Sequence, residues 1–197
     1  MDVYYDDDRC VQRHGEESAI GDGISQIDGR DDFSAVFRDL YEPLVRYARG
    51  VTAATGSAED VVQAVFTKLW EERETIVVER SLKALLYTMV RNRALNANRN
   101  EKNKAASARP QDIDDQETAK VGADEHLAAK NLRRRLSEWI DDLPPRRREA
   151  FVLSRYHGLS HKEIANVMDV SKRTADTHVM HALQDLRRHL DELRNED

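Results

Sequence analysis

Residues 158–179 read GLSHKEIANVMDVSKRTADTHV, and this stretch predicts two short helices that meet at a tight corner. Ser160 and Glu163 form the Ser-x-x-Glu pattern of a capping box at the start of the first helix. Asp169 lies where the corner needs a left-handed backbone, which aspartate tolerates better than most residues other than glycine. Ser171 follows in position to cap the second helix. This pattern is typical of a helix-turn-helix.

The second predicted helix has an apolar side and a polar, partly basic side. We expect the apolar side to be buried; it consists of Ala175, Val179, Ala182, Leu183 and Leu186. In a helix-turn-helix the second helix enters the major groove by its N-terminus, where Lys172 and Arg173 can reach guanine edges or phosphates. Asp176 repels phosphate unless it accepts from a cytosine amine or braces a base such as Arg173, and both alternatives stay open. The competing interpretation is a helical corner whose outer face is only solvated.

The composition favours an all-helical chain. Of 197 residues, 40% are hydrophobic and 35% charged, whereas aromatics reach only 6% and only 4 prolines and 8 glycines occur. Sheet proteins carry more β-branched, aromatic and turn residues. No apolar run approaches the ~20 residues that a membrane span needs, so we expect no membrane insertion. The single cysteine, Cys10, has no partner for an internal disulfide, which fits a reducing cytoplasm.

The net charge of −6 comes from one end of the chain. The first 32 residues hold ten acidic and three basic residues, and the remainder is nearly neutral with local basic clusters. The acidic total therefore does not exclude a nucleic-acid-binding protein. Residues 1–30 lack periodicity and are predicted to be a disordered acidic tail; a short helix that forms on a partner is the alternative. Their acidity also excludes a secretory signal or a transit peptide.

The remaining chain divides into two helical units. Residues 31–54 carry apolar residues at steps of three and four, and Pro43 either bends this helix or starts a second one. Helices capped by Ser57 and Ser81 should complete a three-helix core, the last one ending in a basic, asparagine-rich stretch. Residues 105–123 are polar without a stripe and are predicted to be a linker. In the second unit the first helix has a stripe that we expect to be buried: Leu132, Leu136, Trp139 and Ile140.

Two segments resemble one known family. Residues 143–190 resemble the fourth conserved region of bacterial sigma-70-type transcription initiation factors, and residues 33–74 with 81–100 resemble the second region. Two such regions joined by a short linker are similar to the extracytoplasmic-function group. The resemblance implies an all-α fold of two small helical domains. The resemblance divides the chain into an acidic tail (1–30), region 2 (31–104), a linker (105–123) and region 4 (124–197).

The resemblance implies partners rather than catalysis. A member of this family binds core RNA polymerase, guides it to promoter DNA and helps to open the duplex, without a cofactor. Region 2 docks on a coiled coil of the largest polymerase subunit, and the matching positions are Asp60, Gln63, Phe66 and Trp70. Ala64 stands where the family often has glutamate. Core packing is the alternative role for Phe66 and Trp70, and helix capping for Asp60.

The resemblance also assigns DNA contacts. The matching minus-ten positions are Arg91, Asn92, Arg93, Asn96, Arg99 and Asn100, with a solvated basic helix end as the alternative. The family frequently has aspartate in place of Asn96 and tryptophan in place of Leu85. The matching minus-thirty-five positions are Lys172, Arg173, Thr174, Asp176, Thr177, His178 and His181, although His178 has the core boundary as an alternative.

Two further segments receive roles without a firm residue assignment. The loop 74–80 matches the segment that captures a flipped base, but it lacks an aromatic residue, so no pocket residue is named. The three arginines 146–148 match a segment that touches phosphate or the polymerase flap, and a solvated helix start explains them equally well.

The charge pattern predicts weak DNA binding by the free chain, which we expect to be a monomer. Polymerase would hold both readers at a set distance, so that binding becomes effectively intramolecular. An anti-sigma factor is a further partner that the resemblance admits. One rival hypothesis is a helix-turn-helix regulator that dimerises and binds a palindrome unaided. Another is a metal site at the pairs His157 with His161 or His178 with His181, but no matching cysteine or carboxylate set accompanies them.

Overall fold

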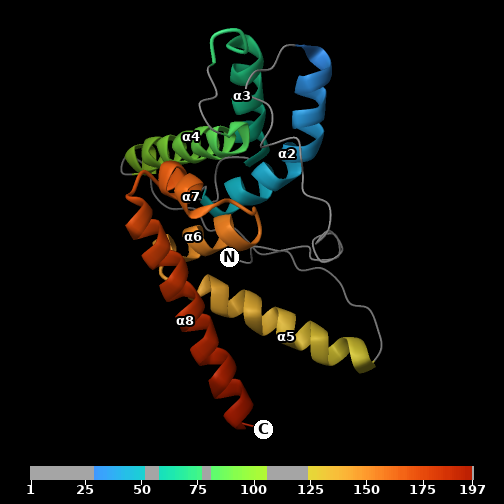
Figure 1. Ribbon diagram of the computed structural model, residues 1–197, viewed down its shortest axis with the longest axis vertical. Helices are drawn as coiled ribbons and strands as arrows, with labels where there is room; N and C mark the ends of the chain where they lie inside the picture. Colours follow the sequence, from blue (N-terminus) through green and yellow to red (C-terminus); the bar gives the residue numbers. More distant parts are fainter. Residues whose placement is uncertain (1–28, 52–57, 77–80, 106–123, 197) are drawn as a thin grey trace.

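The computed structural model describes residues 29–51, 58–76, 81–105 and 124–196, and every regular element in these ranges is a helix (Figure 1). The N-terminal unit contains α2 (Arg30–Val51), α3 (Ala58–Glu71) and α4 (Leu82–Ala105). The C-terminal unit contains α5 (Asp124–Asp141), α6 (Pro145–Arg155), α7 (His161–Met168) and α8 (Lys172–Glu196). The all-helical prediction is confirmed. The predicted tail and linker lie outside the described residues, and the domain boundaries stay a prediction.

The N-terminal unit closes the predicted three-helix core. Leu44 of α2, Leu69 of α3 and Leu86 of α4 are fully buried in one cluster. Helix α2 continues through Pro43 and changes direction along its length (Figure 1), because proline removes one backbone donor and its ring crowds the preceding turn. Ser81 caps α4 as predicted, since its Oγ accepts from the backbone N–H of Ala84 at 3.2 Å. The predicted cap Ser57 lies outside the described residues.

The corner between α7 and α8 has the predicted chemistry. Ser160 Oγ accepts from the Glu163 backbone N–H, and the Glu163 carboxylate accepts from the Ser160 backbone N–H, which completes the capping box. Asp169 has φ 54° and ψ 55°, so the corner uses a left-handed residue. Ser171 Oγ accepts from the Thr174 backbone N–H at 3.1 Å. Each of these contacts satisfies a backbone group that a helix end leaves unpaired.

Part of the apolar stripe in the C-terminal unit is exposed, contrary to the prediction. Leu132 and Leu136 of α5 are 46% and 38% exposed, and Leu183 of α8 is 37% exposed. The reason is geometric: α5 diverges from α8 toward its own N-terminal end (Figure 1), and these three leucines line an open groove between the two helices. Within residues 131–141, α5 is covered at its C-terminal part, where Ile140 is buried and Trp139 stacks on His189 with centroids 5.5 Å apart.

The two units pack against each other and share one core. Helix α4 lies against α7, and the buried cluster that contains Leu86 and Val90 also contains Leu153, Ile164 and Met168. The sequence predicted a core closed by the three helices of the N-terminal unit, without a contribution from the other unit. Helix α7 contacts α6 and α8 of its own unit and α4 of the other unit, so elements of both units cover its apolar face.

Candidate nucleic-acid interface

The first turn of α8 is an exposed basic site. Lys172 and Arg173 are exposed, while Ala175 is fully buried and fixes the rotation of the helix. The hydroxyl of Thr177 donates to the Arg173 backbone carbonyl at 2.8 Å, and the hydroxyls of Thr174 and Ser171 lie 2.7 Å apart. A helix N-terminus with two neighbouring cations favours an anion such as a DNA phosphate. The geometry therefore suits the predicted role of this turn.

Asp176 has a partner that the sequence did not indicate. Its Oδ1 lies 2.6 Å from Nδ1 of His161, the first residue of α7, and both side chains are about half exposed. The two alternatives considered from sequence were a cytosine amine and Arg173. The contact with His161 instead draws the carboxylate toward α7, which lowers its repulsion of a phosphate at the start of α8.

The histidines farther along α8 are partly buried. Partial burial lowers the pKa of His178, and the nearby cations Arg146 and Arg147 act in the same direction. His178 is therefore neutral at pH 7 and can contribute a hydrogen bond rather than a charge. His181 is also partly buried.

The three arginines at the start of α6 all have carboxylate neighbours within the C-terminal unit. Arg147 contacts Asp185 at 2.8 Å and Arg148 contacts Asp141 at 3.2 Å. Arg146 is more exposed and lies 3.9 Å from Glu149. These pairs give the arginine run a structural role that neither alternative from sequence contained.

The C-terminal half of α4 presents the predicted minus-ten residues unevenly. Asn92, Arg93, Asn96 and Arg99 are exposed, whereas Arg91 is only 6% exposed. The side chain of Asn100 lies outside the described residues. Arg91 is thus shielded from solvent in this arrangement of the two units.

Glu149 explains the burial of Arg91. Its Oε1 accepts from Nε of Arg91 at 2.6 Å and from the hydroxyl of Tyr47 at 3.0 Å, so one carboxylate of α6 joins α4 and α2. The side chains of Arg91 and Glu149 are 7% and 14% exposed. Burial raises the pKa of Tyr47, and the neighbouring Glu149 carboxylate adds to this shift. We call Arg91, Tyr47 and Glu149 the interface triad.

His157 makes a second polar contact between the units. Its Nδ1 lies 2.8 Å from the hydroxyl of Tyr87 on α4. Burial raises the pKa of Tyr87, so the phenol keeps its proton, and the tautomer of His157 sets which of the two groups donates in this contact. Nε2 of His157 is buried and has no hydrogen-bond partner among the described residues. Burial lowers the pKa of His157 to about 3, and Arg46 and Lys83 contribute to the shift.

The predicted polymerase-docking residues lie on α3. Asp60 and Gln63 are exposed, Phe66 is buried, and Trp70 is half-buried with the Arg73 guanidinium 4.3 Å from its ring centroid. Phe66 therefore has the packing role weighed from sequence. The described part of the predicted base-capturing loop is limited to residues 74–76.

An aromatic cluster beside these residues was missed from the sequence. Phe33 lies 5.0 Å from Trp70 between ring centroids, and Phe37 lies 4.9 Å from Phe66 and 4.8 Å from Tyr41. Phe37 is 39% exposed. The signal was present in the sequence, because three aromatics four residues apart on one helix form a single stripe.

Comparisons with known proteins agree with this geometry. Residues 36–104 match the family described as Sigma-70 region 2, and residues 133–186 match Sigma-70, region 4. The two matches span 69 and 54 residues, together 123 of 197. A relative described as ECF RNA polymerase sigma factor SigL, from Mycobacterium tuberculosis, is 29% identical over 169 residues, covering 81% of this chain and 92% of the relative.

Two solved structures share the fold. The sigma factor RpoE, in complex with the anti-sigma factor NepR from Bartonella quintana, gives a TM-score of 0.63 at 21% identity and covers 82% of this chain and 98% of RpoE. CnrH, in complex with the cytosolic domain of CnrY, gives a TM-score of 0.56 at 20% identity, with 84% and 91% covered. Within the described residues no helix is long and apolar enough to cross a membrane. The chain belongs to the sigma-70 family of RNA polymerase sigma factors, which act in transcription initiation, and within that family to the extracytoplasmic-function group.

Proposed function

We propose that this protein is a cytoplasmic, non-catalytic sigma factor that binds core RNA polymerase and directs it to promoters with a minus-ten and a minus-thirty-five element. The observation that carries the proposal is the capped helix-turn-helix with Lys172 and Arg173 exposed at the start of α8, in one chain with a region 2 unit. Basic side chains at this position of the second helix enter the major groove.

Each of the two units has its own role in promoter recognition. The start of α8 reads the minus-thirty-five element, with Lys172 on a phosphate and Arg173 on a base edge as the simplest assignment. The exposed end of α4 reads the minus-ten element with Asn92, Arg93 and Asn96. Amide side chains suit base edges, and the arginine adds a phosphate contact. Asp60 and Gln63 of α3 face outward for the polymerase.

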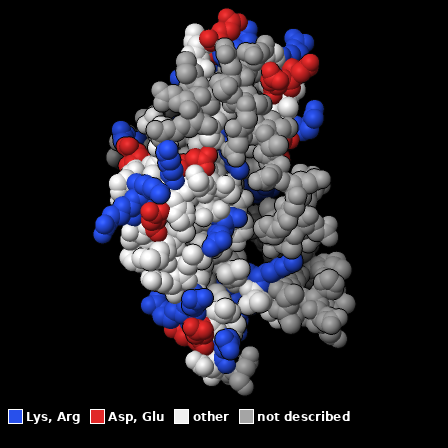
Figure 2. All heavy atoms as spheres, viewed as in Figure 1, with Lys and Arg blue, Asp and Glu red and all other residues white. Residues whose placement is uncertain are grey.

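The free chain should bind DNA weakly. Figure 2 shows basic and acidic side chains interspersed on the visible face rather than gathered in one basic patch. Non-specific affinity for DNA rises with the number of phosphates that a protein neutralises, so a surface of mixed charge gives only a low affinity. Core polymerase would supply further contacts and fix the spacing of the two units.

The packed arrangement has a consequence for promoter binding. Glu149 holds Arg91 at the interface, where the Arg91 side chain is 7% exposed and cannot reach a phosphate. The two units therefore separate before the full minus-ten surface is available. An anti-sigma factor is a fitting regulator of this step. RpoE of Bartonella quintana was solved with such a protein, and the same class of partner is proposed for this chain.

Run-off transcription with core polymerase tests the proposal. We expect a specific start site only when the chain is added, and we expect the K172A/R173A variant to lose most of this activity. The K162A variant is the matched control, because Lys162 is an exposed lysine on α7 outside the predicted reading surface. Transcription that is indifferent to the chain, or a purified dimer that binds a palindrome without polymerase, would refute the proposal.

A further inference from the structure

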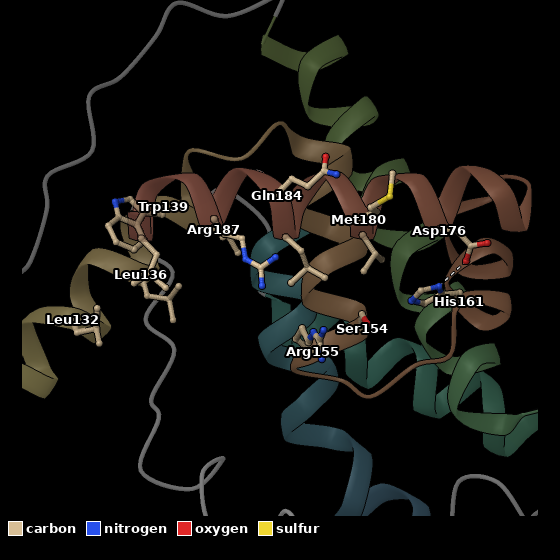
Figure 3. Close-up of a pocket in the computed structure, with 14 residues that line it drawn as sticks. Leu132, Leu136, Trp139, Ser154, Arg155, His161, Asp176, Met180, Gln184 and Arg187 are labelled. Carbon is tan, nitrogen blue, oxygen red and sulfur yellow. Dashed lines mark hydrogen bonds and ion pairs between the residues drawn. The ribbon is translucent and has the colours of Figure 1, made fainter. Parts of the chain in front are cut away.

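An open apolar groove runs between α5 and α8. Its volume is about 950 Å³, and Leu132, Met180 and Leu190 on its walls are 46%, 49% and 43% exposed. Figure 3 shows the leucines of α5 facing α8 across this space. Large apolar side chains that are exposed together in one groove indicate a binding site, because their contact with water is unfavourable.

The groove also carries an uncompensated positive charge. Arg155 at the end of α6 and Arg187 of α8 line it and both are exposed, and Figure 3 shows the Arg187 side chain extending from α8 into this space. Within the described residues neither guanidinium has a carboxylate partner. Among the described residues, Asp176 is the one carboxylate that lines the groove, and it already faces His161. A matching occupant therefore combines apolar side chains with adjacent carboxylates.

The N-terminal segment of the same chain has this composition. Residues 1–28 hold eight acidic residues and two arginines, a net charge of −6, whereas the remaining 169 residues hold 29 acidic and 29 basic residues. Within the segment, residues 3–8 read VYYDDD, with two tyrosines directly before three aspartates. Tyrosine rings match the apolar walls and the aspartates match the two arginines.

The segment is long enough to reach the groove from the start of α2. Twenty-eight residues span up to about 90 Å when extended, whereas a compact protein of 197 residues has a radius of gyration of about 16 Å. Attachment through the chain gives the segment an effective concentration on the order of millimolar at the groove. A contact that is weak between separate molecules is therefore well populated within one.

We propose that residues 3–8 dock in the α5–α8 groove, with Tyr4 and Tyr5 on its apolar walls and Asp6 to Asp8 beside Arg155 and Arg187. The segment thereby covers the apolar face of the C-terminal unit in the free protein, and any partner that binds this face competes with it. The proposal does not depend on the proposed function, since it concerns the free chain alone.

The test uses the full chain and its only cysteine. A nitroxide attached to Cys10 lies two residues from the proposed contact and broadens nearby methyl signals in NMR spectra. Selective ¹³C labelling of methionine methyls gives four signals, from Met1, Met89, Met168 and Met180. We expect loss of the Met1 signal, which shows that the label is active, and strong broadening of Met180 in the groove, while Met89 on α4 keeps at least half of its intensity.

Charge-reversed variants separate the proposed contact from chance proximity. The R155E/R187E variant should restore most of the Met180 intensity, and adding D6K/D8K to it should broaden the signal again. The R38E/K162E variant is the matched control, because it reverses two exposed cations outside the groove and should behave like the parent. Circular dichroism checks that each variant is folded.

Three results would overturn the proposal. Met180 could stay sharp in the parent while Met1 is lost, or broaden equally in the parent and the folded R155E/R187E variant. The third result comes from a mixture of two copies, one with the nitroxide but no ¹³C and the other with ¹³C-labelled methionines but no nitroxide. Broadening of the Met180 signal in this mixture would place the segment of a second copy in the groove.

Discussion

Replacing Glu149 with alanine should open the packed arrangement of the two units. Glu149 lies on α6 but holds Arg91 on α4 at 2.6 Å and Tyr47 on α2 at 3.0 Å. The substitution leaves the Arg91 guanidinium at a site where its side chain is only 7% exposed, without its carboxylate. In the separated form the same guanidinium is solvated. The substitution therefore penalises only the packed form.

The magnitude follows from this asymmetry. Removing one partner of a buried ion pair costs about 3–5 kcal/mol, and we take the lower end because Glu149 retains some solvent contact. A shift of about 3 kcal/mol changes the ratio of packed to separated chains by about 100-fold. If polymerase binds only separated chains, the apparent dissociation constant falls by up to the same factor, until the separated form dominates.

The assay pairs small-angle scattering of the free chain with titration of core polymerase. The E149A variant should show a larger radius of gyration and tighter polymerase binding. Y47F removes one hydrogen bond of the interface triad, worth about 1 kcal/mol, and should shift binding by about fivefold. D185N is the matched control: Asp185 pairs with Arg147 at 2.8 Å inside the C-terminal unit, so its loss should leave polymerase affinity unimproved.

A specific outcome would refute this reasoning. If folded E149A has the scattering profile of the parent and binds polymerase no more tightly, the interface triad does not hold the units together. An equal gain in affinity for D185N would also contradict it, because the effect would then come from general loosening of the C-terminal unit.

Three other predictions follow from single residues. Burial lowers the pKa of His157 to about 3, and the pKa returns to about 6.5 when the units separate, so neutral His157 stabilises the packed form fully above pH 6.5. At pH 5 this stabilisation is smaller by about 2 kcal/mol. Scattering should therefore show expansion of the chain over this pH range, and the H157F variant should lack it. D169G should raise the melting temperature by about 2–4 °C, because glycine adopts φ 54° without strain, and calorimetry that shows a lower value would contradict this. R173A should cost about 1–3 kcal/mol of binding free energy at the minus-thirty-five element and relax specificity there. K172A should weaken binding to all sequences alike and reduce the salt dependence of binding. Binding of holoenzyme to promoter variants measures both effects.

Local contacts were predictable because their partners are close in sequence. The capping box at Ser160 and Glu163, the left-handed Asp169 and the cap at Ser171 each depend on residues three or four positions apart. Such contacts follow from the geometry of a single helix end, and no tertiary information is needed. The same is true of the buried face of α8 at Ala175 and Val179.

Contacts between the units were not predictable, because nothing local distinguishes their residues. Glu149 follows three arginines and looks like part of a solvated helix start, yet its partner Tyr47 is 102 residues away. Arg91 belongs by pattern to an exposed basic helix end. The exposure of Leu132 and Leu136 was not predictable either, since a stripe shows which face of a helix is apolar but not whether another helix covers it.

Under the proposed function, Arg91 connects the packing of the two units to promoter binding. If Arg91 binds a promoter phosphate as proposed, its guanidinium cannot hold Glu149 at the same time, and promoter DNA would compete with α6 for this side chain. The packed form has opposing free-energy contributions: a buried ion pair contributes little net free energy, and Nε2 of His157, which has no hydrogen-bond partner among the described residues, costs about 1–3 kcal/mol. A packed form held by such small differences can be opened by a partner whose preference for the separated form is only a few kcal/mol. Polymerase binding to α3 and phosphate binding to Arg91 would then act on one equilibrium, and each should strengthen the other.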